Sequence, residues 1–439
     1  MFCNMEGKIK VVWICHLSNE QIHKSLRYSR FYFQKITSVL FHKPIERWND
    51  FAIWNTNAIR QFESFHDIEL TVVFPYSGIK GEIQRFDYNG IHYVAFRSED
   101  DTILSIIKTR LCKSYTCTYT KNRRRIASII KEVQPDIVHV VGAENPYYSI
   151  AALDIPDEIP SIVSLQTLMS DPNFVANYPI SSKPAYEYRT DLEQQIIKKC
   201  RYIGSRVEYF RTIVWNQIKK DAVFLNISLA VGVDIDDRPC EKEYDFVYFA
   251  ANINKACDYA IEAFALVCAK HPELTLNVSG SYTPDYKAKL DQRLLELGIQ
   301  GQVFFSGPKA THDDVIKQIK KSRYALLPLK IDLISGTIRE AMACGLPVVT
   351  TITPATPNLN EDRECVLLSE KGDFLAMANN MLRLIDDENF ATTIRQNAII
   401  TVRERYCNER YMQLLRQAYY EIYENDKKGK PFSEEIISK

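Results

Sequence analysis

Apolar stretches of strand length alternate with amphipathic stretches of helical length along the C-terminal half of the chain. Helical stretches such as Tyr259–Lys270 and Asp285–Leu297 carry apolar residues at three- and four-residue spacing. Repeated strand–helix alternation predicts a parallel sheet with helices on both faces. The predicted strands of this half are Phe246–Ala250, Leu274–Ser279, Val303–Ser306, Tyr324–Pro328, Pro347–Thr350 and Cys365–Leu368.

The N-terminal half repeats this pattern less regularly. A polar stretch, Asp234–Glu243, is interrupted by Pro239 and reads as a linker between the two halves. Because 439 residues exceed the size of one ordinary hydrophobic core, we expect two Rossmann-like α/β domains facing each other across a cleft, residues 1–235 and 236–407. A last helix, about Asn408–Glu424, has an apolar stripe and belongs to a tail at 408–439. The predicted N-terminal strands are Lys10–Cys15, Glu69–Phe74, His92–Phe96, Asp136–Val141, Ser161–Leu165 and Ala222–Asn226.

Composition excludes several classes of protein. Hydrophobic residues make up 46% and charged residues 25% of the chain, which is typical of a globular protein. The sequence has no apolar run of membrane-spanning length, and residues 1–10 lack the apolar core of a signal peptide. The 11 cysteines form no CxxC pair, as expected in a reducing compartment. We therefore expect a cytoplasmic protein.

The net charge is zero, but two stretches of the N-terminal half, 21–45 and 102–131, contain basic residues and no acidic ones. Aromatic and apolar residues lie between the basic ones, a mixture that suits contact with anionic lipid head groups. The alternative is two solvated charged faces. The first interpretation predicts a peripheral position on the inner membrane face.

One loop of the C-terminal half has the composition of an anion site. After the strand Tyr324–Pro328 comes the turn Ser335-Gly336-Thr337, followed by a short helix that stops at Gly345. Small residues at a helix start leave backbone N–H groups accessible, and the helix dipole adds positive potential, so a pyrophosphate fits there. Glu340, expected in the first helical turn, is a candidate for binding a ribose diol, and Asp332 for binding sugar hydroxyls. An ordinary strand–helix turn is the alternative.

The segment Ile338–Val349, with its run Ala-Met-Ala-Cys-Gly-Leu-Pro-Val-Val, resembles the nucleotide-sugar signature of the group 1 glycosyltransferases, also called glycosyltransferase family 4. The likeness continues backwards through Ala260–Ala265, His271-Pro-Glu-Leu and Val303–Gly307. This resemblance implies the two-domain fold known as GT-B, with the last helix crossing back to the N-terminal domain. It also implies transfer of a sugar from a nucleoside diphosphate sugar with retention of anomeric configuration. Asp332 and Glu340 are then the catalytic candidates.

The chain departs from the family pattern at four places, one of which is the absence of the tight Gly-Gly loop after the first strand. Asp332 stands where the family usually has Glu, Gln166 where it often has His, and only Lys255 matches the Arg and Lys that neutralise the donor pyrophosphate. In the mechanism that the resemblance implies, the leaving diphosphate accepts the acceptor proton, so no dedicated base is required. We expect Lys255, Ser335, Gly336, Thr337 and Glu340 to bind the donor. Neither a metal nor a cofactor is expected, although Asp234-Ile-Asp236 has the form of a metal-binding DxD.

Four residues after N-terminal strands are candidates for the acceptor side: His16, Asn19, Glu144 and Gln166. For His16, Asn19 and Glu144, the alternative is a role in stabilising turns or the core. The motif Gly142-Ala-Glu-Asn-Pro-Tyr-Tyr148 is similar to that of members from capsule and surface-polysaccharide loci.

The expected function is therefore a metal-independent retaining glycosyltransferase of surface-polysaccharide synthesis, with a glycan or lipid-linked acceptor and no nucleic-acid partner. Two alternatives stay open. A sugar-nucleotide 2-epimerase would share the fold, and a non-catalytic paralogue that binds a nucleotide sugar would share the donor site.

Overall fold

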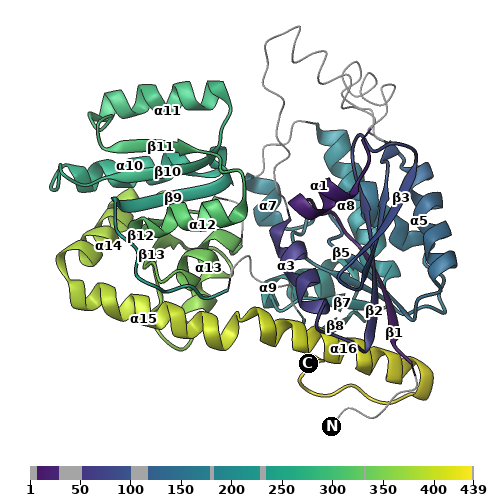
Figure 1. Cartoon of the computed structure of the whole chain (residues 1–439). Coiled ribbons are helices and arrows are strands. Elements are labelled where there is room, and N and C mark those ends of the chain that lie inside the picture. The colour runs from purple at the N-terminus through teal and green to yellow at the C-terminus, as the bar shows by residue number, and fades with distance from the viewer. Residues whose placement is uncertain are drawn as a thin grey trace, which may run out of the picture. The chain divides into compact units, whose positions relative to one another are not determined.

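The computed structural model describes residues 7–28, 52–99, 117–177, 182–227, 234–330 and 333–437. The chain divides into two compact units, drawn in Figure 1. Unit 1 consists of Met1–Ala230 together with Glu409–Lys439, and unit 2 of Val231–Asn408. The C-terminal tail therefore returns to the N-terminal unit, which confirms the predicted crossing.

Unit 1 is built on an eight-stranded sheet in the order β3-β4-β2-β1-β5-β6-β7-β8. Neighbouring strands pair in parallel except β3 and β4. All six strands predicted for this half are present. The sheet consists of β1 (Ile9–Ile14), β2 (Ile68–Pro75), β3 (Ile83–Tyr88), β4 (Ile91–Phe96), β5 (Ile137–Val141), β6 (Ser161–Ser164), β7 (Tyr202–Gly204) and β8 (Val223–Leu225).

The antiparallel β3 differs from the expected purely parallel sheet. The two-residue connection to β4 is Asn89-Gly90, and both residues have positive φ, 50° and 80°. Two residues with positive φ form the hairpin turn whose twist matches that of paired strands, and Asn-Gly is its preferred sequence. The Asn89-Gly90 dipeptide is therefore a local sequence signal for this hairpin, separate from the alternation of strands and helices.

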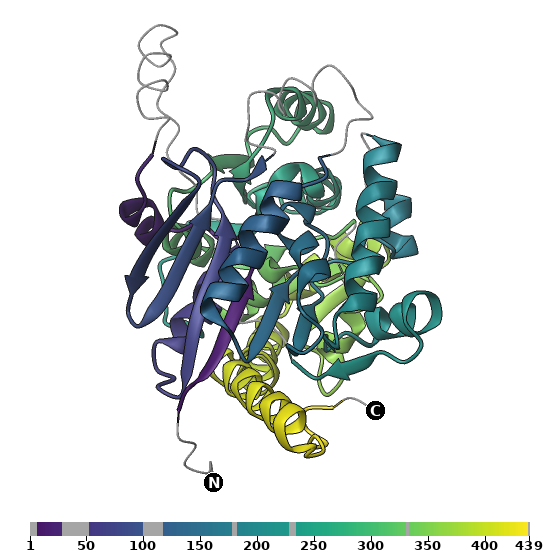
Figure 2. The ribbon, with the colours of Figure 1, turned by 90° about the vertical axis from the view of Figure 1, so that its right-hand side faces the viewer.

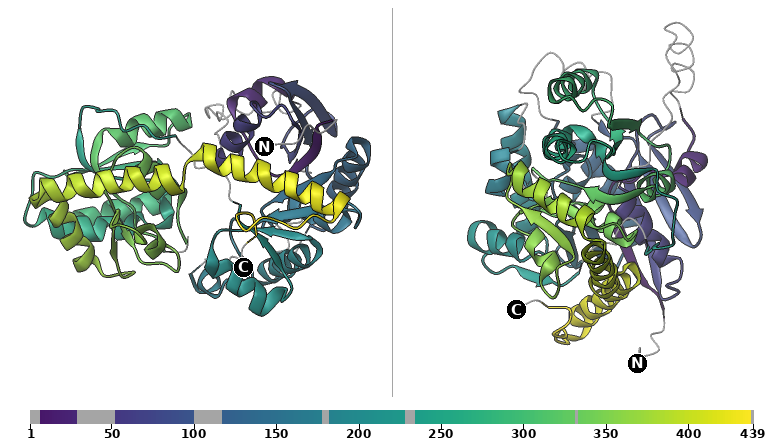
Figure 3. Two further views of the ribbon diagram at one scale, coloured as in Figure 1. Left: turned by 90° about the horizontal axis from the view of Figure 1, so that it is seen from below. Right: turned by 90° about the vertical axis from the view of Figure 1, so that its left-hand side faces the viewer.

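Helices cover both faces of this sheet. Figure 2 shows helix α5 (Thr120–Val133) lying across one face. The C-terminal helix runs along the other side of unit 1 (Figure 3). The helices of unit 1 are α1 (Glu20–Ser25), α3 (Ile53–Phe62), α5 (Thr120–Val133), α6 (Pro146–Ser149), α7 (Pro172–Asn177), α8 (Lys183–Lys199), α9 (Glu208–Ile213) and α16 (Asn408–Lys428), with single turns η2 (Ile150–Asp154) and η3 (Val214–Ile218).

The apolar stripe of α16 belongs to the core of unit 1. Leu415, Tyr419 and Ile422 are fully buried in one cluster with Trp13 of β1 and Phe62 of α3. Each buried side chain of this size contributes about 1.5–3 kcal/mol relative to exposure. The helix is therefore part of the domain and not an appendage.

A chain of buried hydrogen bonds joins α16 to three neighbouring strands. The Trp13 indole Nε1 donates to the Tyr419 hydroxyl at 2.6 Å, and that hydroxyl lies 2.6 Å from Nδ1 of His139. His139 Nε2 lies 2.7 Å from the Ser164 hydroxyl. Because indole N–H can only donate, the Tyr419 hydroxyl accepts from it and donates to His139 Nδ1, which leaves the proton of a neutral imidazole on Nε2. Burial lowers the pKa of His139 to about 3, so the ring stays neutral.

Ion pairs fix the middle and the end of α16 to unit 1. Near the middle of the helix, Arg416 pairs with Asp67, and the two side chains are 20% and 25% exposed. Near its end, Arg201 Nη1 lies 2.7 Å from Asp426. These contacts set the register of the helix against the sheet.

Unit 2 is a six-stranded sheet in the order β11-β10-β9-β12-β13-β14, in which every pairing of neighbours is parallel. The six strands predicted for this half are all present. They are β9 (Tyr244–Asn252), β10 (Leu276–Ser281), β11 (Val303–Gly307), β12 (Ser322–Leu326), β13 (Val348–Thr351) and β14 (Val366–Ser369).

The helices of unit 2 enclose this sheet in a single apolar core with the buried strands. Alternating strands and helices of this kind form a Rossmann-like domain. The helices are α10 (Cys257–Cys268), α11 (Pro284–Leu297), α12 (His312–Lys320), α13 (Gly336–Ala343), α14 (Phe374–Asp386) and α15 (Glu388–Arg405), with single turns η4 (Ile253–Lys255) and η5 (Thr356–Asn360).

Over the described ranges, no helix is both long and apolar enough to span a membrane. The cysteines in these ranges are all free thiols, and most are buried.

We predict that Tyr419→Phe destabilises unit 1. The change leaves the indole N–H of Trp13 and Nδ1 of His139 buried without their partner, and each such loss costs about 1–3 kcal/mol. The free energy of unfolding should fall by about 2–4 kcal/mol, and hydrogen exchange in β1 and β5 should quicken. The control is Tyr423→Phe, a partly buried tyrosine on the same helix, which should change little. Equal stability of both variants would contradict this account of the network.

Candidate active site

The loop between β12 and α13 forms an open helix N-terminus. Ser335 is the N-cap residue, but its hydroxyl lies 2.8 Å from the Thr337 hydroxyl and does not cap the helix. Within the described residues, the amides of Gly336 and Thr337 have no hydrogen-bond partner. A Cβ placed on Gly336 would meet no atom within 4 Å. Accessible amides and the helix dipole make this end of α13 suited to an anion such as a diphosphate.

Glu340 lies one turn further along α13 and is held from a second helix. Its Oε1 is 3.1 Å from Nε2 of His312, the first residue of α12, and the two side chains are 13% and 17% exposed. The expectation that Glu340 stands in the first helical turn was wrong, because the helix begins at Gly336 and its first turn contains no acidic residue. His312 was not predicted as a site residue, because it lies outside the Ile338–Val349 signature that contains its partner Glu340.

The helix stops where the sequence predicts. Gly345 has a φ of 68°, and the two amides that follow the helix turn back onto it: Gly345 N donates to Met342 O at 3.0 Å and Leu346 N to Ala341 O at 2.9 Å. This pair of bonds is the Schellman motif, which favours glycine at the left-handed position. The turn leads directly into β13.

Lys255 follows β9, the strand next to β12, as the α13 loop follows β12. It ends η4, directly after β9, and is exposed. Because β9 and β12 pair in parallel, Lys255 and the α13 loop emerge from the same edge of the sheet. Asp332, the other catalytic candidate, lies outside the described residues, so its predicted role stays a prediction.

Two further lysines stand at this edge and were not predicted. Lys330 follows β12 and binds both carboxylate oxygens of Asp258, at 2.6 and 2.8 Å, above the ring of Tyr259. Lys371 follows β14 and donates to the Lys330 carbonyl at 2.6 Å. Burial lowers the pKa of Lys371. The charge of Lys330 is therefore compensated within the fold, which makes it a weak replacement for the missing Arg.

The DxD-like pair Asp234 and Asp236 is occupied by other contacts. Asp236 accepts from Arg238 at 2.7 and 3.1 Å and pairs with Lys320 at 2.7 Å, and these cations hold its pKa well below the usual range. Asp234 accepts from the amide of Asn408 at 3.1 Å. No group of three or more metal-binding side chains is found in the part of the chain that the structure describes.

Three of the four acceptor-side candidates come to one edge of the unit 1 sheet. His16, Glu144 and Gln166 follow β1, β5 and β6, which are adjacent in the sheet. His16 is partly buried, and burial lowers its pKa to about 4, so the imidazole is neutral at pH 7. Its Nδ1 lies 3.3 Å from the Tyr147 hydroxyl.

Glu144 is buried with one carboxylate oxygen unsatisfied. Its Oε1 accepts from the Asn145 amide at 3.0 Å, whereas no described group binds Oε2. The Arg189 guanidinium donates to the main-chain oxygen of Glu144 at 2.8 Å, so this cation does not bind the carboxylate directly. Burial raises the pKa of Glu144 to about 7.

Asn19 and Gln166 differ in whether their polar side-chain atoms have hydrogen-bond partners. Asn19 caps α1 by accepting from Ile22 N at 2.9 Å and donates to the Thr56 hydroxyl at 3.2 Å. These bonds give it a structural role, the alternative weighed from the sequence. Gln166, in contrast, has a buried Nε2 to which no described acceptor is hydrogen-bonded.

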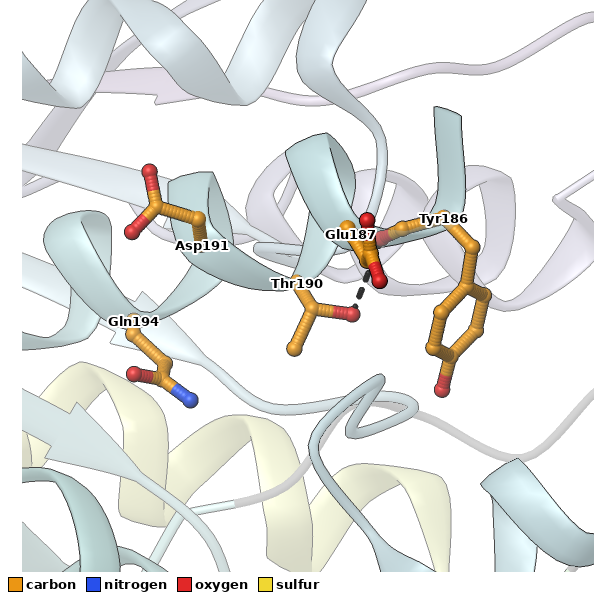
Figure 4. A pocket seen from close by; sticks show the side chains of 5 residues that line it. All are labelled: Tyr186, Glu187, Thr190, Asp191 and Gln194. Atoms are coloured by element: carbon orange, nitrogen blue, oxygen red, sulfur yellow. Dashed lines mark hydrogen bonds between the residues drawn. The ribbon is translucent and has the colours of Figure 1, made fainter. Parts of the chain in front are cut away.

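The loop after β6 is fixed by α8. The fully buried Glu193 of α8 accepts from the amides of Met169 and Ser170 at 2.8 and 3.1 Å. The exposed side of the same helix carries a hollow of about 250 Å³, which contains no predicted site residue. Figure 4 shows the side chains that line it, Tyr186, Glu187, Thr190, Asp191 and Gln194. The helix thus serves the acceptor edge as a support, and its hollow is separate from the predicted site residues.

Much of the two basic stretches lies outside the described residues, namely 29–45 and 102–116. Of the described part, Arg123 forms a two-bond pair with Asp154 at 2.6 and 2.7 Å. Arg125 donates to Arg97 O at 2.6 Å and lies 3.0 Å from Glu82. Lys121, Arg124 and Lys131 are exposed. The stretch is therefore less uniformly solvent-facing than its sequence suggests.

Comparison with known proteins gives the family of unit 2. Residues 244–387 match the family model "Glycosyl transferases group 1". Unit 2 contains a group 1 glycosyltransferase domain. A curated relative, the N-acetyl-alpha-D-glucosaminyl L-malate synthase of Bacillus anthracis, is 26% identical over 170 residues, which make up 39% of this chain and 43% of the relative. The match thus spans less than half of that protein.

Solved glycosyltransferases share the fold of the whole chain. Sucrose-phosphate synthase from Thermosynechococcus elongatus superposes with a TM-score of 0.65 at 13% identity, covering 95% of this chain and 99% of the other. Anabaena HepE in complex with UDP gives 0.62 at 14% identity, over 94% and 100%. The S. aureus protein TarM, in a complex that includes alpha-GlcNAc-glycerol and UDP, gives 0.52 at 16% identity, over 67% and 58%. The fold is GT-B, with two Rossmann-like domains, as predicted.

We predict that Gly142→Ala displaces the Glu144 carboxylate. A Cβ at residue 142 would lie 2.7 and 2.9 Å from the two carboxylate oxygens, and the φ of 90° adds strain. The control is Gly81→Ala, at a φ of 83° with no atom near its Cβ, which carries the strain alone. Chemical denaturation should show Gly142→Ala less stable than Gly81→Ala by about 1–3 kcal/mol, the range for overpacking. Equal losses would mean that the carboxylate does not occupy this space.

Proposed function

We propose that the protein is a retaining glycosyltransferase that uses a nucleoside diphosphate sugar as donor. The observation that carries this proposal is the open N-terminus of α13, followed by Glu340, inside the segment that matches the group 1 family. HepE and TarM, which share the fold, are both described in complexes with UDP, and this supports a nucleoside diphosphate as the leaving group.

In the proposed donor complex, the amides of Gly336 and Thr337 bind the diphosphate. Glu340 accepts hydrogen bonds from the ribose diol, with its carboxylate oriented by His312. Lys255 supplies positive charge from the neighbouring strand end, and Ser335 shapes the turn. Preorganised donors directed at the departing diphosphate stabilise the charge that develops as the glycosidic bond breaks.

Retention follows if acceptor and leaving group occupy the same face of the sugar. The leaving diphosphate oxygen then accepts the proton of the acceptor hydroxyl, and no side chain has to act as the base. Gln166, in the place where the family often has His, is compatible with this course because an amide cannot remove a proton. Asp332 is the candidate for orienting the transferred sugar, and the reaction proposed here requires no metal.

The acceptor proposed is a glycan or lipid-linked sugar in surface-polysaccharide synthesis. TarM, described in complex with alpha-GlcNAc-glycerol, offers one parallel. We further propose that three exposed basic residues of α5, namely Lys121, Arg124 and Lys131, attract the protein to an anionic membrane surface. Each basic residue that lies near such a surface contributes about 1 kcal/mol to the binding free energy.

Release of nucleoside diphosphate tests the reaction. The protein is incubated with a panel of nucleotide sugars, with and without a glycan-lipid extract. A transferase releases nucleoside diphosphate faster when the extract is present. Epimerisation of the donor without any acceptor would instead indicate a 2-epimerase, and binding without turnover a non-catalytic protein; either result refutes the proposal.

We predict that Glu340→Ala and Lys255→Ala each weaken UDP binding by about 1.5–3 kcal/mol, the value of a hydrogen bond to a charged group. Isothermal titration calorimetry measures the loss. The control is Glu388→Ala, an exposed acid at the start of α15, which should bind UDP like the parent protein. Unchanged UDP affinity in a folded Glu340→Ala protein would refute the donor site.

We predict that the protein sediments with anionic vesicles at low salt and is released as salt rises, because screening weakens each charge contact. The triple variant Lys121→Glu, Arg124→Glu, Lys131→Glu should lose this binding. Arg123→Glu is unsuitable as a first test, because it also breaks the pair with Asp154. Two outcomes would show that the basic residues are simply solvated: equal sedimentation with neutral and anionic vesicles, or unchanged binding to anionic vesicles in the triple variant.

A further inference from the structure

Glu144 has a burial and bonding pattern that its own fold does not explain. The residue is 8% exposed, one carboxylate oxygen has no partner among the described residues, and the nearby guanidinium of Arg189 is bonded to the main chain. A buried carboxylate without full hydrogen bonding costs free energy, and ionisable groups perturbed by burial cluster at functional sites. Gly142 leaves the space that this carboxylate fills.

A complementary unsatisfied group lies at the next strand end. The side-chain nitrogen of Gln166, a donor, is buried without a partner within the described ranges. Val141 pairs with Ser164, so the chain leaves β5 and β6 at the same level, three residues before Glu144 and two before Gln166. One group offers an acceptor and the other a donor. A hydroxyl both donates and accepts, and it satisfies the two together.

Aromatic side chains surround the same strand ends. Tyr148 donates to the Val141 carbonyl at 2.7 Å, and its hydroxyl lies against the same space over Gly142 as Glu144. The ring of His16 is 5.5 Å from that of Tyr148 and 6.3 Å from that of Trp54. Trp54 of α3 is 39% exposed, so part of this large apolar side chain is open to solvent at the edge of this cluster.

The combination identifies a class of ligand. A pyranose ring carries hydroxyl groups and also has an apolar face of C–H groups. Its hydroxyls form hydrogen bonds with polar groups of a protein, and its apolar face packs on aromatic rings. We propose that this cluster is a pyranose subsite, in which Glu144 and Gln166 bind one hydroxyl of a sugar ring and Trp54 packs against its face. The inference rests on the proposed function, since it makes the acceptor a sugar.

Binding at this subsite depends on pH. Burial raises the pKa of Glu144 to about 7, while Arg189 and the main chain oppose the rise; Tyr148 of α6 and Glu193 of α8 are the other ionisable groups that interact with it. A hydroxyl that donates to the carboxylate favours its charged form. Sugar affinity should therefore increase as pH rises from about 6 to about 8, across the pKa of this group.

Saturation-transfer NMR on the full chain tests the proposal. The probes are glucose, galactose and N-acetylglucosamine with their methyl glycosides, at millimolar concentration. At least one should bind, with affinity lowered about tenfold in Glu144→Gln and in Trp54→Ala, and Glu144→Gln should abolish the pH dependence. The control Tyr88→Ala removes an aromatic ring that is 38% exposed elsewhere in unit 1 and should leave binding unchanged.

UDP titration of the same proteins separates this proposal from the donor site. Both variants should bind UDP like the parent, because the changes lie in unit 1. Sugar binding that survives while UDP fails to bind would refute the donor site and leave the subsite standing. Two outcomes overturn the subsite. One is that no sugar probe gives a signal that is lost in Trp54→Ala, and the other is that folded Glu144→Gln keeps the pH dependence of the parent protein.

Discussion

The hydrogen-bond chain from Trp13 through Tyr419 and His139 to Ser164 is the contact on which unit 1 depends. It joins the C-terminal helix to β1, β5 and β6, the three strands whose ends carry His16, Glu144 and Gln166. The Trp13 indole, the Tyr419 hydroxyl and the neutral His139 ring each donate to one acceptor in the chain, which fixes the order of their protons. A buried network of this kind specifies one arrangement, because any slip of the helix leaves several polar groups unsatisfied.

The two units handle charge differently at their strand ends. In unit 2, the edge presents open amides and lysines, of which Lys330 is compensated by Asp258. In unit 1, the edge presents a neutral imidazole, an amide and an acid whose pKa is raised by burial. The first environment favours an anion and the second a neutral polar molecule. This contrast agrees with a charged donor and an uncharged acceptor group.

Much of the fold could be predicted, because period and alternation are local properties of the chain. The strands of unit 2 followed from apolar runs, and the stop at Gly345 followed from glycine, which adopts positive φ without steric cost. The hairpin at Asn89-Gly90 was not predicted, although Asn-Gly favours such turns, because an alternation of strands and helices implies only parallel pairs.

The site was less predictable, since its contacts join segments far apart in sequence. The pairing of Glu340 with His312 spans 28 positions, and no local sequence pattern near either residue predicts it. Asn19 has a polar side chain after a strand, as Glu144 has, yet it caps a helix. The ion pairs of Arg123 and Arg125 show the same limit, because partners distant in sequence decide whether a charge faces solvent.

The return of α16 to unit 1 has a consequence for how the chain folds. Unit 2 is, in topological terms, an insertion between two parts of unit 1. During synthesis from the N-terminus, unit 2 has all its residues available before unit 1 does, because Tyr419 and its helix follow unit 2 in the sequence. Until then the indole of Trp13 and the imidazole of His139 lack their shared partner. The domain that begins the chain can thus be completed only after unit 2 has been synthesised.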